Sequence, residues 1–280
     1  MKTMKNISKC LAAILLVVNL SSCVDLEPEP LSFFAPENTF MDKEGLEALL
    51  ITSRKQIKWE WFGDAFNAGY CETPLVYEYA WSDVSVMGAP EVKEIHNLET
   101  QLTPTTSMAL HLRYWDLAWN GIKYANTVIS RVPKSTIDNE TDKNELLAEG
   151  YFHRAYWYYL LVNQWGDVPL LLEEITEPKL DFYTVSRMKI LQQMKTDMEF
   201  AVKWLPKNVK PGCVNRAAGE HLLAKIYLST GDFQLAVDAT TRCINDYGLH
   251  LMKERFGVNA EDASLDVFND LFQEDNISSS

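Results

Sequence analysis

The sequence contains few of the residues and motifs that mark metal, redox and common hydrolase sites. Its five cysteines include no CxxC pair, and its five histidines lack the spacing of metal ligands. No GxSxG, HExxH or GxGxxG motif and no phosphate-binding loop occurs. We therefore expect no cofactor, no metal and no enzyme. A hydrolase stays open as an alternative, because two carboxylates roughly 5 to 9.5 Å apart in a cleft would suffice for a glycosidase.

Positive charge is scarce as well. The 26 lysines and arginines face 39 acidic residues, which gives a formal net charge of −13. Such a surface repels nucleic-acid phosphates and anionic lipid head groups, so it argues against nucleic acid as a partner. With 47% hydrophobic residues, 280 residues are enough for a large core, and the chain as a whole is not expected to be disordered.

The amino terminus has the organisation of a secretion signal. A basic stretch with Lys2, Lys5 and Lys9 precedes an apolar run over residues 11–18, which is too short for a permanent membrane span. The run leads to Leu20-Ser21-Ser22-Cys23, which resembles the processing site of bacterial lipoproteins, where the cysteine is acylated.

This pattern predicts three segments. Residues 1–22 form a signal peptide, Cys23 is the lipidation site, and residues 23–40 form an acidic, proline-containing tether. Each buried acyl methylene contributes about 0.8 kcal/mol, so two or three chains would hold a soluble domain on a membrane. The expected location is the outer membrane, with the protein lipid-anchored and exposed at the cell surface.

The remaining residues, 41–280, read as a mainly all-α domain. Apolar residues recur at three- and four-residue steps, and Pro133, Gly166 and Gly231 lie where helices should end. The expected helices pair into three hairpins, the first interrupted by a long irregular insertion after its first helix. The expected helices span residues 42–58, 107–132, 138–164, 185–204, 217–230 and 233–247, and the insertion spans about 59–106.

The last hairpin follows the tetratricopeptide pattern. Leu223, Ala224 and Tyr227 occupy the large, small and aromatic positions of its first helix, and Ala236 occupies the small position of its second. Small residues are needed where two helix backbones approach closely. Thr240 stands where the pattern has an aromatic residue, so the match is incomplete.

The irregular insertion contains the candidate ligand site. Tyr77, Tyr79 and Trp81 alternate as on an extended segment, and Asp83 follows. Aromatic faces with a nearby carboxylate suit a sugar ring and its hydroxyls, so Tyr79, Trp81 and Asp83 are the candidate ligand contacts. Core packing is the alternative for Trp81.

Other conspicuous side chains are given structural roles. Trp115, Trp119 and Trp157 fall at helical spacing and are expected in the core. We expect the neighbouring acids Glu173 and Glu174 to lie on a solvated face.

On the helix over 138–164, Arg154 is expected to form an ion pair with Glu149 or with an acid of a neighbouring helix. His153 is then expected at the surface. Cys71, Cys213 and Cys243 are expected to be small buried residues without a disulfide.

Several segments in order resemble the SusD/RagB family of outer-membrane nutrient-binding lipoproteins of the Bacteroidetes. They are the Cys23-Val24-Asp25-Leu26 start, the segment from Tyr114 to Ile129, the stretch from Ala148 through Gln164-Trp165-Gly166-Asp167-Val168-Pro169-Leu170, and the stretch from Asn215 to Asp232. The resemblance covers only about the amino-terminal half of a typical member. We therefore expect a truncated gene or a fragment, in which residues 270–280 lead towards a missing region.

The resemblance implies a role in polysaccharide utilization. A family member would bind carbohydrate, mainly an oligosaccharide, and deliver it to a SusC-like TonB-dependent transporter. Two alternatives remain at this point: a peptide-binding uptake lipoprotein, and a tetratricopeptide-type protein-interaction scaffold without a small ligand.

Overall fold

The structure is a computed structural model that describes residues 40–62, 84 and 109–271. The chain divides into two units, Met1–Thr39 and Phe40–Ser280, and all described residues belong to the second. The longer helices are α2 (Lys43–Phe62), α6 (Ala109–Arg131), α7 (Glu140–Gln164), α8 (Arg187–Trp204), α9 (Arg216–Thr230) and α10 (Phe233–Asn245). Short elements are a 3-10 turn η2 (Val132–Lys134), strands β1 (Val168–Pro169) and β2 (Thr184–Val185), and helix α11 (Val267–Leu271). Within the described residues, no helix has both the length and the apolar character needed to cross a membrane.

Helix ends follow local sequence chemistry. The Asn139 side chain accepts hydrogen bonds from the first turn of α7, and Asn215 does the same for α9. Pro133 lies in the turn that follows α6. Gly166 and Gly231, with φ of 74° and 82°, take the left-handed conformation that ends α7 and α9 at little steric cost. The predicted helices are therefore confirmed, most of them within two residues at each end.

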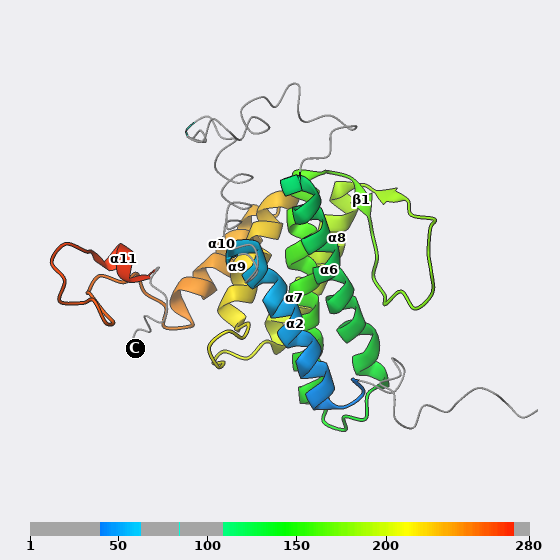
Figure 1. Ribbon diagram of the computed structural model, residues 1–280, viewed down its shortest axis with the longest axis horizontal. Helices are drawn as coiled ribbons and strands as arrows, with labels where there is room; N and C mark the ends of the chain where they lie inside the picture. The colour runs from blue at the N-terminus through cyan, green and yellow to red at the C-terminus, as the bar shows by residue number, and fades with distance from the viewer. Residues whose placement is uncertain (1–39, 63–83, 85–108, 272–280) are drawn as a thin grey trace, which may run out of the picture. The chain divides into compact units, whose positions relative to one another are not determined.

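Helix α7 is the centre of the fold (Figure 1). It packs against α6 and α8, and more lightly against α2 and α9. Its Trp157, Tyr158 and Leu161 are fully buried. A Cβ atom on Gly121 of α6 would lie 2.0 Å from Trp157 Nε1, so a residue without a side chain is what lets α6 approach this indole.

The hairpin arrangement is confirmed. Helices α2 and α6 contact each other, as do α7 and α8, and α9 and α10. Leu223, Ala224, Tyr227 and Ala236, the tetratricopeptide-type positions, are all buried. The antiparallel pairing of Val168 with Val185, which sequence periodicity did not predict, ties the two ends of the α7–α8 connection together.

Three expectations need correction. Helix α2 continues through Trp59 and Trp61, which were assigned to the irregular insertion, and both are partly exposed at its end. His153, expected at the surface, is fully buried with its Nε2 3.4 Å from Glu149 Oε1. Cys213 and Cys243 are only half-buried free thiols, while Cys71 lies outside the described residues.

Arg154 pairs with Asp197 of the neighbouring helix α8, and not with Glu149 of its own helix. Glu149 instead receives two hydrogen bonds from Arg54 of α2, at 2.5 and 2.8 Å. Beyond the end of α2, Val84 is the one residue of the predicted insertion that the structure describes before residue 107.

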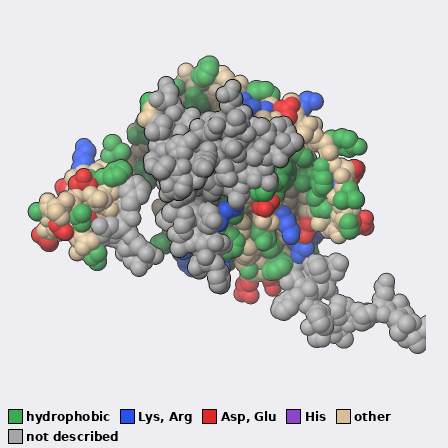
Figure 2. Space-filling model, turned by 45° about the horizontal axis from the view of Figure 1, so that its top comes forward, with side chains coloured by type: hydrophobic (Ala, Val, Ile, Leu, Met, Phe, Trp, Pro, Cys, Tyr) green, Lys and Arg blue, Asp and Glu red, His purple; other side chains and the backbone are tan. Residues whose placement is uncertain are grey.

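Several large apolar side chains remain at the surface. On the face shown in Figure 2, hydrophobic side chains lie among charged ones. The α7–α8 connection and α10 each contribute several exposed apolar side chains. They include Leu180, Phe182 and Tyr183 of the connection, and Phe233, Val237 and Ile244 of α10.

Candidate ligand-binding site

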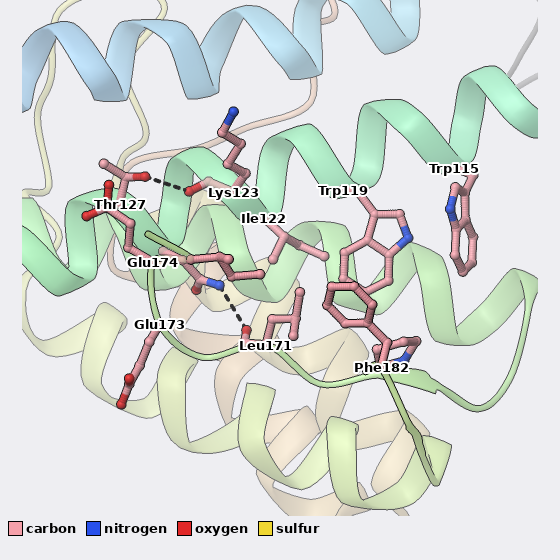
Figure 3. Close-up of a pocket in the computed structure, with 12 residues that line it drawn as sticks. Trp115, Trp119, Ile122, Lys123, Thr127, Leu171, Glu173, Glu174 and Phe182 are labelled. Carbon is pink, nitrogen blue, oxygen red and sulfur yellow. Dashed lines mark hydrogen bonds between the residues drawn. The ribbon is translucent and has the colours of Figure 1, made fainter. Parts of the chain in front are cut away.

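A pocket of about 600 Å³ lies between α6 and the segment that follows β1. The lining residues of α6 are Trp115, Trp119, Ile122, Lys123, Asn126 and Thr127. The lining residues of the α7–α8 connection are Pro169, Leu171, Glu173, Glu174, Ile175 and Phe182. Figure 3 shows the two tryptophans along α6 and Phe182 on the opposing segment. The volume falls in the range typical of small-ligand sites.

The aromatic wall is held in place by ring contacts. Trp115 meets Trp119 edge-to-face with centroids 5.4 Å apart, and it meets Trp165 in the same way at 5.2 Å. Trp119 in turn meets the buried Tyr158 at 6.0 Å. Since each indole already has an ordered neighbour, little side-chain freedom is left to lose when a ligand enters.

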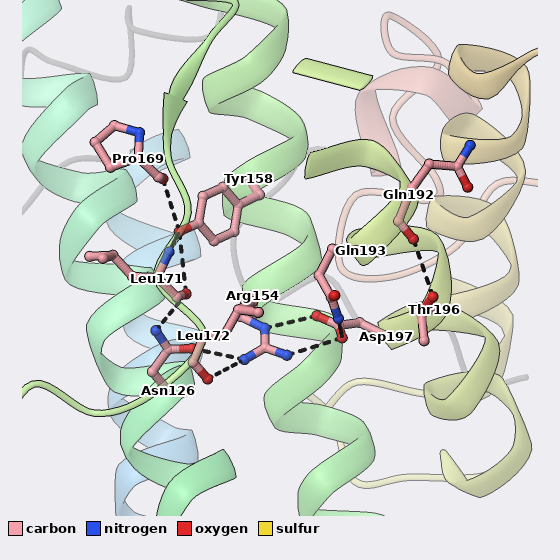
Figure 4. Close-up of polar contacts among 10 residues, drawn as sticks. All are labelled: Asn126, Arg154, Tyr158, Pro169, Leu171, Leu172, Gln192, Gln193, Thr196 and Asp197. Atoms are coloured by element: carbon pink, nitrogen blue, oxygen red, sulfur yellow. Dashed lines mark hydrogen bonds and ion pairs between the residues drawn. The ribbon is translucent and has the colours of Figure 1, made fainter. Parts of the chain in front are cut away.

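Polar contacts from α6 and α7 hold the opposite wall (Figure 4). The Leu171 N–H donates to the Tyr158 hydroxyl at 2.6 Å, and Asn126 Nδ2 donates to the Leu171 carbonyl at 2.9 Å. Arg154 Nη1 donates to the Leu172 carbonyl at 2.8 Å. Burial raises the pKa of Tyr158 well above its ordinary value, so its hydroxyl stays protonated.

Arg154 is fixed by the carboxylate of Asp197 on α8. Its Nε and Nη2 donate to the two oxygens of Asp197 at 2.8 and 3.0 Å, and both side chains are buried. Gln193 donates a further hydrogen bond to Asp197 at 3.0 Å. A buried charge pair needs such additional partners to offset its desolvation. The network therefore joins α6, α7 and α8 to the wall of the pocket.

The two acids of the pocket differ. Glu174 accepts two hydrogen bonds from Arg131, at 2.9 and 2.6 Å, and its backbone N–H donates to the Ser130 hydroxyl. Glu173 is exposed, and no ion pair joins it to another described residue; the same holds for the Lys123 ammonium. The expectation of a solvated pair is therefore met by Glu173 and wrong for Glu174.

Trp119 carries an unsatisfied donor. Its indole N–H is shielded from solvent and meets no acceptor among the described residues. A buried donor without a partner costs about 1–3 kcal/mol. The pocket therefore contains one unpaired donor in its aromatic wall, besides the charged groups of Lys123 and Glu173.

The structure does not describe the residues proposed from the sequence. Cys23, Tyr79, Trp81 and Asp83 are all outside the described residues, so their roles stay predictions. In the described ranges, no group of three His, Cys, Asp or Glu side chains is placed to hold a metal ion.

The sequence interpretation missed this pocket. Trp115 and Trp119 were assigned to the core, and the structure leaves both half-buried at its edge, whereas Trp157 is fully buried as expected. Helical spacing could not distinguish the three tryptophans, because each lies on the apolar face of its helix. Trp115 and Trp119 differ from Trp157 because the α7–α8 connection lies opposite them and leaves a pocket between itself and α6.

Comparison with known proteins assigns the family. Residues 71–228, more than half of the chain, match the SusD-like family described as "Starch-binding associating with outer membrane". The chain belongs to this family of glycan-binding proteins associated with the outer membrane.

Two curated relatives agree with this assignment. The chain is 27% identical over 238 residues to SusD-like protein P2 of Formosa agariphila, an alignment that covers 83% of this chain and 45% of the relative. It is 28% identical over 155 residues to a SusD-like protein of Bacteroides ovatus, covering 48% of this chain and 28% of that protein. The alignments thus span less than half the length of either relative.

Solved structures share the fold. A SusD superfamily protein from Bacteroides vulgatus superposes with a TM-score of 0.67 at 20% identity, covering 80% of this chain and 48% of that one. A structure with xylogluco-oligosaccharide gives 0.60 at 21% identity, covering 75% of this chain and 42% of that one. A laminarin-binding SusD-like protein gives 0.60 at 20% identity, covering 76% and 47%. The mainly helical, tetratricopeptide-like fold is confirmed.

Proposed function

We propose that this protein is a surface lipoprotein that binds oligosaccharides and passes them to a SusC-like TonB-dependent transporter without hydrolysing them. The observation that carries the proposal is the family match over residues 71–228. Of the solved structures with the same fold, one is a crystal structure with xylogluco-oligosaccharide and another is a laminarin-binding SusD-like protein, which supports a glycan as the ligand.

The physical requirements of glycan capture fit the chain. Sugar rings have apolar faces that pack on aromatic side chains, and hydroxyls that need donors and acceptors. The chain offers an aromatic pocket beside α6, and its sequence supplies Tyr79, Trp81 and Asp83 as further predicted contacts outside the described residues. Binding of this kind needs no metal or cofactor.

Glycan binding is tested with affinity electrophoresis of the purified full chain in gels containing soluble starch, laminarin or xyloglucan. We expect retarded migration in at least one gel and no release of reducing sugar. Unretarded migration in all gels, together with binding of a peptide mixture in calorimetry, would favour the peptide-uptake alternative. Release of reducing sugar would identify a hydrolase.

Membrane attachment is tested separately with labelled palmitate. The wild-type chain should incorporate the label and sediment with the outer membrane, and a Cys23→Ala variant should do neither, because it lacks the acylated sulfur. A label on both variants would contradict anchoring at Cys23.

The transporter is tested by chemical cross-linking on intact cells of the source organism. We expect a cross-linked band that contains a large TonB-dependent barrel, and the band should persist in the Trp81→Ala variant, because that residue is assigned to the glycan. If no barrel cross-links, hand-over to a transporter is wrong even where glycan binding holds.

A further inference from the structure

We infer that the pocket lined by Trp115, Trp119 and Phe182 is a glycan-contact site of its own, in addition to the predicted Tyr79, Trp81 and Asp83 cluster. The inference rests on the proposed glycan-binding function and adds a place for the ligand. It assigns the pocket to a neutral sugar chain whose rings pack on the aromatic wall.

The first argument is preorganisation. One wall is a helix whose two indoles are fixed by edge-to-face contacts. The other wall is tied to the core through the Leu171 and Leu172 backbone, by Tyr158, Asn126 and Arg154. A site whose walls are already ordered loses little entropy on binding, and this is typical of ligand pockets.

The second argument is the pairing of the polar groups. Glu174 is already bound to Arg131, and Asn126 to Leu171 and Arg154. Lys123 supplies a donor and Glu173 an acceptor that no described residue engages. Sugar hydroxyls both donate and accept hydrogen bonds, so a sugar chain can use both groups.

The third argument favours a sugar over a purely apolar occupant such as a leucine-rich peptide segment. The Trp119 N–H, in the aromatic wall, has no acceptor among the described residues, and a sugar hydroxyl carries an acceptor of the kind it lacks. An aliphatic side chain would leave this donor unpaired and would also cover the charged groups at the rim. The net negative charge of the protein repels a polyuronate, so a neutral chain is favoured.

The decisive variant is Phe182→Ala, with Tyr183→Ala as its matched control. Both residues lie on the same exposed connection, with Phe182 45% and Tyr183 79% exposed, but Tyr183 does not line the pocket. Removing an aromatic contact should weaken binding about two- to tenfold. We expect this loss for Phe182→Ala and wild-type affinity for Tyr183→Ala, measured by titration calorimetry with the glycan that binds the wild-type chain.

A second variant, Trp119→Ala, should weaken binding at least as strongly as Phe182→Ala. Its far-UV circular dichroism and urea midpoint show whether the fold is intact, and if it unfolds, the Phe182 and Tyr183 pair decides alone. Equal affinity of the Phe182→Ala and Tyr183→Ala chains would overturn the inference while leaving glycan binding in place. A wild-type chain that binds none of the three glycans overturns the proposed function itself.

A double variant distinguishes the pocket from the predicted contacts Tyr79, Trp81 and Asp83. In a Trp81→Ala background, residual glycan binding should persist and should then be lost on adding Phe182→Ala. If Trp81→Ala alone removes all binding, the pocket is not an independent contact site.

Discussion

Helices α7 and α10 show how differently two apolar helices of one chain are used. Helix α7 has neighbours on several sides and buries thirteen residues, including two of opposite charge, Glu149 and Arg154. Helix α10 contacts mainly α9 and buries only Ala236 and Ala239. Burial is therefore set by the number of packed neighbours, not by how apolar a helix is.

The exposed face of α10 makes the contrast plain. Phe233, Val237 and Ile244 are 66%, 55% and 66% exposed, although their spacing puts them on one stripe. Because Ala236 and Ala239 occupy the α9 side, the two helices approach closely there and the larger residues face away. We therefore expect the contacts among α6, α7 and α8 to contribute most to the free energy of unfolding.

The largest expected effect comes from breaking the charge pair inside this layer. Arg154→Ala leaves Asp197 buried without its partner and removes the hydrogen bond to Leu172. The free energy of unfolding should fall by about 3–5 kcal/mol. Urea denaturation followed by circular dichroism measures it.

The control for this prediction is the double variant Arg154→Met with Asp197→Leu. It replaces both charges by apolar groups of similar size, so it should be clearly more stable than Arg154→Ala alone. A loss below 1 kcal/mol for Arg154→Ala would show that water reaches Asp197 and that the pair is not buried in solution.

A smaller effect is expected from truncating one apolar side chain on α7 and one on α10, which compares how much each helix contributes to stability. Leu161→Ala removes a fully buried side chain of α7 and should cost about 3 kcal/mol. Ile244→Ala on α10 should stay within about 0.5 kcal/mol, because it removes an exposed side chain and alanine favours helix. Equal costs in urea denaturation would mean that a partner covers α10 in solution.

The smallest effect is a pH dependence at Glu149 of α7. Burial alone would raise its pKa, but His153 and Arg54 more than offset this and hold the pKa below its ordinary value of 4.5. A carboxylate with a lowered folded-state pKa adds stability above its unfolded pKa, and this is lost as the pH falls through the folded value. The stability difference between wild type and Glu149→Gln should therefore shrink below about pH 4.5.

This dependence is measured from urea midpoints of both chains between pH 7 and pH 3. Glu174→Gln is a suitable comparison, since Glu174 also pairs with an arginine but lies at the pocket, away from α7. A constant difference between wild type and Glu149→Gln across this range would contradict the lowered pKa.

Much of the helical framework was predictable from local patterns. Asn139, Asn215, Gly166 and Gly231 act within one turn of chain, so their positions define helix ends without reference to the rest of the fold. The tetratricopeptide-type residues Leu223, Ala224, Tyr227 and Ala236 are also separated by short distances in sequence. The pairing of α9 with α10 followed from the short Gly231-Asp232 connection, and the two earlier pairs were predicted by analogy with it.

The pocket and its supports were decided only by tertiary structure. The sequence left Arg154 with either Glu149 or an unspecified acid of a neighbouring helix. The packing of α7 on α8 selected Asp197, and the packing of α2 on α7 paired Glu149 with Arg54. The same packing buried His153 and left Trp119 at the edge of a cavity. The two ion pairs join residues that are 43 and 95 positions apart in the chain. Periodicity indicates which face of a helix is apolar, but not which element covers that face.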